Sequence, residues 1–139
     1  MMSKPSWLGL IALLFVTNLA GAQDVQPLPP NTRIERELTS AQTHTYRIPL
    51  KPGQFVHFDV FQKSIDVLMS LTAPDGKPVT EVDVSSFGLP ETLSAIATIS
   101  GNYQLRIQTA SAPNIKGNYQ VKAEIKSAAT ETDKKRVQA

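Results

Sequence analysis

Apolar and polar residues alternate along most of the chain between Arg33 and Ile125. A period of two is typical of a β-strand with one face buried and the other in water. The clearest run places four apolar residues on a single face: Ile65, Val67, Met69 and Leu71. Helical periodicity is absent before Thr130. The pattern therefore predicts an all-β domain.

Turn signals separate about seven or eight such runs, which favours a β-sandwich or a barrel. The expected strands are 32–38, 45–50, 55–61, 65–72, 79–84, 93–99, 100–107 and 116–125. Ala73–Gly76 supplies a tight turn, because Pro presets one dihedral angle and Gly accepts a positive φ. Gly-Asn-Tyr-Gln occurs at 101–104 and again at 117–120. This repetition suits a hairpin with each Gly-Asn at a strand entrance.

The chain begins with one lysine, an apolar run from Trp7 to Val16, and the small residues Ala20-Gly21-Ala22. These features predict a secretory signal peptide over 1–22, cleaved before Gln23. The alternative is an uncleaved membrane anchor, but the apolar run is shorter than the roughly 20 residues of a spanning helix. We expect no stable membrane insertion after cleavage, and a periplasmic or extracellular location.

Three prolines in 23–31 predict an extended linker before a sandwich domain over 32–126. Residues 127–139 form either a polar tail or the start of a helical region, with Thr130 and Asp133 as its capping pair. The chain contains no cysteine, so it has neither a disulfide nor a lipoprotein anchor. The net charge is +2, and only Lys134, Lys135 and Arg136 cluster. No basic face for nucleic acid is expected.

The order of motifs resembles the bacterial pre-peptidase C-terminal domain. The resemblance covers Ile34 to Ile125 and depends on Thr-Tyr-Arg-Ile, Lys-Pro-Gly-Gln, Ala-Pro-Asp-Gly-Lys-Pro-Val and Ser-Gly-Asn-Tyr-Gln-Leu-Arg-Ile. It implies a jelly-roll-like antiparallel β-sandwich, of the type found before tetratricopeptide repeats and CHAT domains. Some relatives bind calcium through Asp-rich loops, and Asp66 and Asp75 fall at the matching positions. The dense carboxylate set that calcium requires is missing around them.

Few residues have the chemistry of an active site. His44 and His57 are the only histidines, and no Gly-x-Ser-x-Gly elbow accompanies them. We expect both to face solvent, although His57 shares a strand face with Asp59. Two histidines without cysteine do not supply the set of ligands typical of a zinc site. No cofactor and no metal are expected.

The remaining polar and aromatic candidates have simple structural interpretations. Asp75 belongs to a turn, and Asp66 and Asp83 are expected to face solvent, although converging loops could make the three a weak cation site. Tyr103 and Tyr119 align with the apolar faces of their strands, which favours the core over stacking on a sugar or a peptide.

Three apolar residues lie on the faces opposite the main apolar rows of their strands: Phe61, Leu68 and Ile96. Together they would form an exposed patch, which commonly marks a docking surface. The sequence thus predicts a noncatalytic exported module that binds a protein partner or an adjacent domain. The alternatives are a carbohydrate- or matrix-binding module, with or without calcium, and a small hydrolase.

Overall fold

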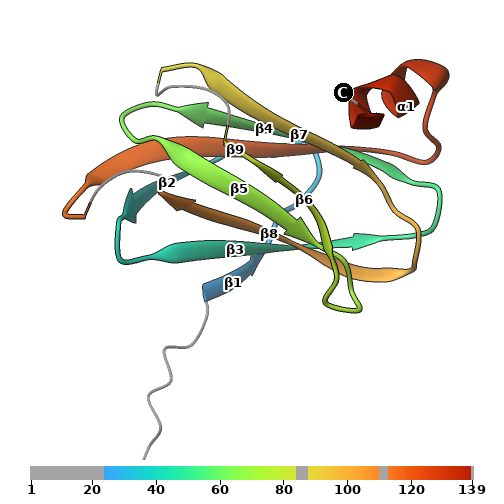
Figure 1. Ribbon diagram of the computed structural model, residues 1–139, viewed down its shortest axis with the longest axis horizontal. Helices are drawn as coiled ribbons and strands as arrows, with labels where there is room; N and C mark the ends of the chain where they lie inside the picture. The colour runs from blue at the N-terminus through green and yellow to red at the C-terminus, as the bar shows by residue number, and fades with distance from the viewer. Residues whose placement is uncertain (1–23, 84–87, 110–112, 139) are drawn as a thin grey trace, which may run out of the picture.

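The computed structural model describes residues 24–83, 88–109 and 113–138 and shows two facing β-sheets (Figure 1). The predicted signal peptide lies outside the described residues. The elements within these ranges are β1 (Asp24–Pro27), β2 (Ile34–Thr39), β3 (Thr43–Leu50), β4 (Phe55–Gln62), β5 (Val67–Thr72), β6 (Pro78–Val82), β7 (Pro90–Ile96), β8 (Gly101–Thr109), β9 (Lys116–Lys126) and α1 (Glu131–Gln138).

One sheet has the strand order β1-β3-β8-β5-β6 and the other has the order β2-β9-β4-β7. Neighbouring strands are antiparallel except for β1 and β3, which are parallel. The predicted all-β, jelly-roll-like sandwich is therefore confirmed. The described ranges hold one strand more than the eight expected, and the additional strand is β1.

Strand β1 lies in the segment predicted to be a linker. The segment is extended, but it pairs with β3 along the sheet edge, where Asp24 lies opposite His44. Leu28 then donates its backbone N–H to the Arg47 carbonyl and buries its side chain. Pro27 is tolerated because it ends an edge strand. The linker prediction is thus wrong for Asp24–Leu28.

A Gly-Asn pair begins β8 and follows the first residue of β9, yet the two strands do not form the predicted hairpin. The chain crosses between them from one sheet to the other. Gly117 is required by packing, because a Cβ atom there would lie 2.3 Å from the Ser64 carbonyl oxygen. The repeated Gly-Asn therefore reflects two separate strand entrances.

The apolar rows of the two sheets face each other and form the core. Tyr103 and Tyr119 are buried in it, as the alternation predicted. The sixth predicted strand ends earlier than expected, since β7 stops at Ile96 and Ile99 is exposed. Ala97 remains buried just beyond the strand.

Helix α1 lies against β7 at one end of the sandwich (Figure 1). Thr130 accepts the Asp133 backbone N–H through its hydroxyl, and Asp133 accepts the Thr130 backbone N–H in return. This reciprocal pair is a capping box of the kind that the sequence indicated. Lys126 donates to Asp133 at 2.8 Å and ties the helix to β9. Across 24–83, 88–109 and 113–138, no helical segment has the length and hydropathy of a membrane span.

Candidate functional site

The outward face of the sheet β2-β9-β4-β7 carries apolar, polar and charged side chains. Alternation along β4 turns Val56, Phe58 and Val60 to the core and the odd-numbered residues outward. We call the outward side the outer sheet face; its residues on β4, β7 and β9 are Phe55, His57, Asp59, Phe61, Pro90, Thr92, Ser94, Ile96, Asn118, Gln120, Lys122 and Glu124.

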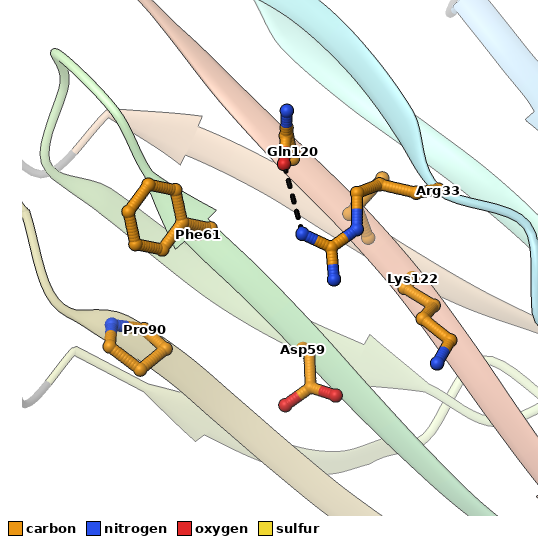
Figure 2. Close-up of a pocket in the computed structure, with 7 residues that line it drawn as sticks. Arg33, Asp59, Phe61, Pro90, Gln120 and Lys122 are labelled. Carbon is orange, nitrogen blue, oxygen red and sulfur yellow. Dashed lines mark hydrogen bonds between the residues drawn. The ribbon is translucent and has the colours of Figure 1, made fainter.

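Strand register gathers several of these residues around a pocket of about 190 Å³. Phe61 lies opposite Pro90 on one side and Gln120 on the other, and Asp59 lies opposite Lys122. Figure 2 shows Phe61 and Pro90 together at one side of the pocket, with Asp59 and Lys122 farther along it. The guanidinium group of Arg33 lies between the Phe61–Pro90 side and the Asp59–Lys122 side.

Each charged group in the pocket has a different environment. Lys122 pairs with Glu124 at 3.1 Å, and Asp59 lies 3.2 Å from a ring nitrogen of His57. Arg33 donates to the neutral Gln120 side chain at 3.1 Å. Among the residues that the structure describes, no carboxylate lies within ion-pair distance of Arg33. Within the described ranges, the pocket therefore presents an arginine whose partner is a neutral amide.

The structure does not bring Phe61, Leu68 and Ile96 together as a single patch. Phe61 is 41% exposed on the outer sheet face. Ile96 is on the same sheet but lies opposite Phe55, at the far end of β4, and is half-buried. Leu68 belongs to β5, in the other sheet. The apolar neighbour of Phe61 is Pro90, which alternation could not identify because Pro90 falls between the expected strands 79–84 and 93–99.

His57 is not the solvent-facing residue that we predicted, since its side chain is only 16% exposed. Its Nδ1 lies 2.6 Å from the Ser94 hydroxyl and its Nε2 lies 3.2 Å from Asp59. The three residues form a Ser-His-Asp chain of hydrogen bonds. Ser94, however, sits in the middle of β7, whereas an activated serine normally stands at a sharp turn beside free backbone N–H groups.

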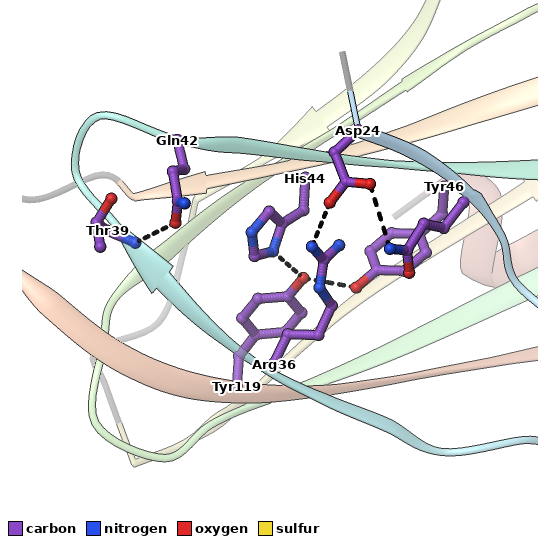
Figure 3. A network of polar contacts seen from close by, with 8 residues as sticks. Asp24, Arg36, Thr39, Gln42, His44, Tyr46 and Tyr119 are labelled. Atoms are coloured by element: carbon purple, nitrogen blue, oxygen red, sulfur yellow. Dashed lines mark hydrogen bonds and ion pairs between the residues drawn. The ribbon is translucent and has the colours of Figure 1, made fainter. Parts of the chain in front are cut away.

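His44 is buried, so the prediction that it faces solvent is wrong. It forms a polar cluster between the sheets with Tyr46, Tyr119, Arg36 and Asp24 (Figure 3). Its Nδ1 lies 2.7 Å from the Tyr119 hydroxyl, which lies 2.6 Å from the Tyr46 hydroxyl. Burial, and then the Arg36 charge, lower the pKa of His44. The sequence could have indicated this burial, because His44 lies two residues before Tyr46 and so shares its side of β3.

Arg36 and Asp24 close this polar cluster at the edge of the sandwich. Arg36 lies opposite Tyr119 in the β2–β9 register and donates to the Asp24 carboxylate, which β1 supplies. The hydrogen bond from Arg36 holds the pKa of Asp24 below its usual value. The ion pair therefore joins the first strand of one sheet to the first strand of the other.

The three aspartates considered as a cation site have different environments. Asp75 accepts the Lys77 backbone N–H in the predicted turn, and Asp83 is exposed, as expected. Asp66 is half-buried, and burial followed by the charges of Asp83 and Glu91 raises its pKa. The expectation that Asp66 faces solvent is therefore wrong. Within the described ranges, no group of three or more histidine, aspartate or glutamate side chains is arranged to hold a metal ion.

Comparison of the sequence with family models and with curated proteins finds no match. The fold, however, is similar to that of several solved structures. PliG from Aeromonas hydrophila, a periplasmic lysozyme inhibitor of g-type lysozyme, is 14% identical with a TM-score of 0.58, over 76% of this chain and 100% of that one. PliG from Salmonella Typhimurium is 18% identical with a TM-score of 0.54, over 74% and 99%.

The pre-peptidase C-terminal domain of collagenase from Bacillus anthracis is also similar in fold. It is 15% identical with a TM-score of 0.59, over 74% of this chain and 97% of that one. A sandwich of the pre-peptidase C-terminal type is thus confirmed at the level of the fold. The predicted neighbouring repeats and CHAT domain remain a prediction.

Proposed function

We propose that this chain is a noncatalytic exported module that binds a protein partner through the outer sheet face. The observation that supports the proposal is the pocket at Phe61, where an exposed phenyl ring and Pro90 adjoin Arg33, which has no ion-pair partner in the described part of the chain. Aromatic and arginine side chains are the commonest anchors of protein interfaces. A partner that covers the phenyl ring and Pro90 would remove apolar surface from water, and one that supplies a carboxylate would pair with the arginine.

The fold supports the same proposal by analogy. PliG is an inhibitor whose target, a lysozyme, is another protein, and it is periplasmic. The collagenase domain is one part of a larger protein. Export of this chain is supported by the signal-like sequence over 1–22. A fold hosts many functions, so the interface has to be argued from the residues of this chain.

The pocket volume favours a protein partner over a free small ligand. Sites that enclose a small molecule commonly measure about 300–1,000 Å³, and this pocket measures about 190 Å³. It can therefore hold one or two side chains of a larger partner more readily than a whole sugar chain. Carbohydrate binding, the alternative function, is tested separately by calorimetry with a polysaccharide panel, with and without calcium.

A pair of matched variants tests the proposal. Phe61 and Val79 are both 41% exposed, and they belong to different sheets. A photo-cross-linking amino acid at position 61 should capture a partner from periplasmic extract, whereas the same group at 79 should not. With that partner purified, and with g-type lysozyme as a first defined candidate, Phe61→Ser should weaken binding about tenfold or more.

Val79→Ser should change the affinity less than about twofold, since it removes a similar exposed apolar group outside the outer sheet face. Circular dichroism verifies that both variants remain folded. Equal capture from positions 61 and 79 would overturn the proposal. So would a partner whose affinity does not change when Phe61 is replaced.

A further inference from the structure

We infer that the Phe61 pocket recognises an extended protein segment with an acidic side chain at one position and an apolar side chain two residues along. This inference rests on the proposed function and names the chemistry of the partner. Side chains two apart in an extended chain point to the same side, about 7 Å from each other. Such a segment can therefore place both of them in one pocket.

The acidic side chain is selected by Arg33. Its guanidinium group faces the middle of the pocket and donates to the neutral Gln120 oxygen. A planar guanidinium can donate two parallel hydrogen bonds to a carboxylate, which is a stronger and more directional contact than a bond to an amide. Lys122 pairs with Glu124 at 3.1 Å, whereas Arg33 has no ion-pair partner among the described residues, so Arg33 is the cation more open to a new carboxylate.

The apolar side chain is selected by Phe61 and Pro90. The two rings lie opposite each other on β4 and β7, and both are exposed. A leucine or phenylalanine of the partner would cover them and remove apolar surface of both molecules from water. No polar group is needed on this side of the pocket.

Asp59 limits where the bound segment can carry an acidic residue. Its side chain is 42% exposed and lies toward the end of the pocket away from Phe61. A second acidic residue there would meet a like charge, whereas a backbone N–H of the segment could donate to it. The pocket thus accepts a single acidic residue, and only at the Arg33 position.

Blocked tripeptides test the inference on the folded, processed protein. The probe is acetyl-Asp-Ala-Leu-amide, and its controls are acetyl-Asn-Ala-Leu-amide and acetyl-Asp-Ala-Ser-amide. Titration followed by backbone amide NMR should shift resonances of β4, β7 and β9 around the pocket. Each control peptide should bind about fivefold or more weakly, because each lacks one of the two anchoring groups.

Protein variants then assign the two contacts. Arg33→Gln should bind the Asp and Asn peptides equally, and Phe61→Ser should bind the Leu and Ser peptides equally. Arg47→Gln, which removes an exposed arginine of β3 in the other sheet, should behave as wild type. Increasing salt should weaken the binding of the Asp peptide more than the binding of the Asn peptide.

The inference is overturned if the Asp peptide does not bind, or if it binds no better than the Asn peptide. It is also overturned if Arg33→Gln still discriminates between them. Those results would leave the proposed function intact provided that Phe61→Ser weakens a purified partner. If Phe61→Ser also leaves the affinity for that partner unchanged, the proposed function fails as well.

Discussion

Replacing Tyr119 with phenylalanine tests whether the buried polar cluster stabilises the sandwich. The change removes one hydroxyl group and leaves the apolar ring in place. That hydroxyl contacts the His44 ring at 2.7 Å and the Tyr46 hydroxyl at 2.6 Å. Because His44 is 4% exposed and Tyr46 is fully buried, water cannot replace the lost contacts without opening the core.

The expected loss of unfolding free energy follows from these two contacts. A net hydrogen bond contributes about 1 kcal/mol, and a buried polar group left without a partner costs about 1–3 kcal/mol. We therefore expect Tyr119→Phe to lower the free energy of unfolding by about 2–4 kcal/mol. For a domain of roughly 110 residues this corresponds to a fall in Tm of about 9–17 °C.

Thermal and urea unfolding, both followed by far-ultraviolet circular dichroism, measure this loss. Tyr103→Phe is the control, because the Tyr103 hydroxyl binds backbone groups of Thr98 and Ile99 in an exposed turn. Water can take over those contacts, so the control should lose only about 1 kcal/mol. A loss at Tyr119 no larger than that at Tyr103 would refute the reasoning.

Further predictions concern the cluster, the core, the helix and the absence of catalysis. Since burial lowers the pKa of His44, the folded state binds its proton less readily than the unfolded state. The contribution of His44 to stability should therefore be complete above pH about 6.5 and be lost as the pH falls below it. In urea titrations His44→Gln should remove this loss, and an unchanged pH profile would contradict the assignment. Gly117→Ala should cost about 1–3 kcal/mol in the same assay, because the new methyl group meets the Ser64 carbonyl; an unchanged midpoint would count against that contact. Thr130→Ala should cost about 1 kcal/mol of helix stability, measured as roughly fivefold faster amide exchange in α1 alone; slower or uniform exchange would exclude a cap. Fluorophosphonate labelling and an esterase and peptidase screen should detect no reactive Ser94. Labelling of the wild-type protein that Ser94→Ala abolishes would contradict the proposal that the chain is noncatalytic.

Alternation predicted eight of the nine described strands, because most of them have a buried face and a wet face, but it missed the edge strand β1. It placed Tyr103 and Tyr119 in the core, and it marked Phe61 as an outward apolar residue. The period of two records only which side of a strand a residue occupies. It does not record which sheet the strand joins, and for this reason Leu68 was grouped with residues of the opposite sheet.

The second source of error was polar residues that occupy core-facing positions of a strand. His44 follows the row of Tyr46 and Ile48, but its chemistry suggested a surface position. The burial becomes understandable only when Tyr119, 75 residues away in the chain, supplies a hydrogen-bonding partner. The pocket at Arg33 was missed for a similar reason, since Gln120 lies 87 residues from it. Contacts of this range depend on the pairing of strands.

The strand order has a consequence for how the protein acquires its structure. Strand β9 is central in its sheet and lies between β2 and β4, although it is the last of the described strands. Until β9 arrives, β2 has no partner and the sheet that contains it is reduced to the β4–β7 pair. A chain that crosses a membrane in an extended state would thus complete this sandwich only after β9 has emerged. Folding should be slow, with a single cooperative step, and the unpaired early strands would depend on chaperones during the delay.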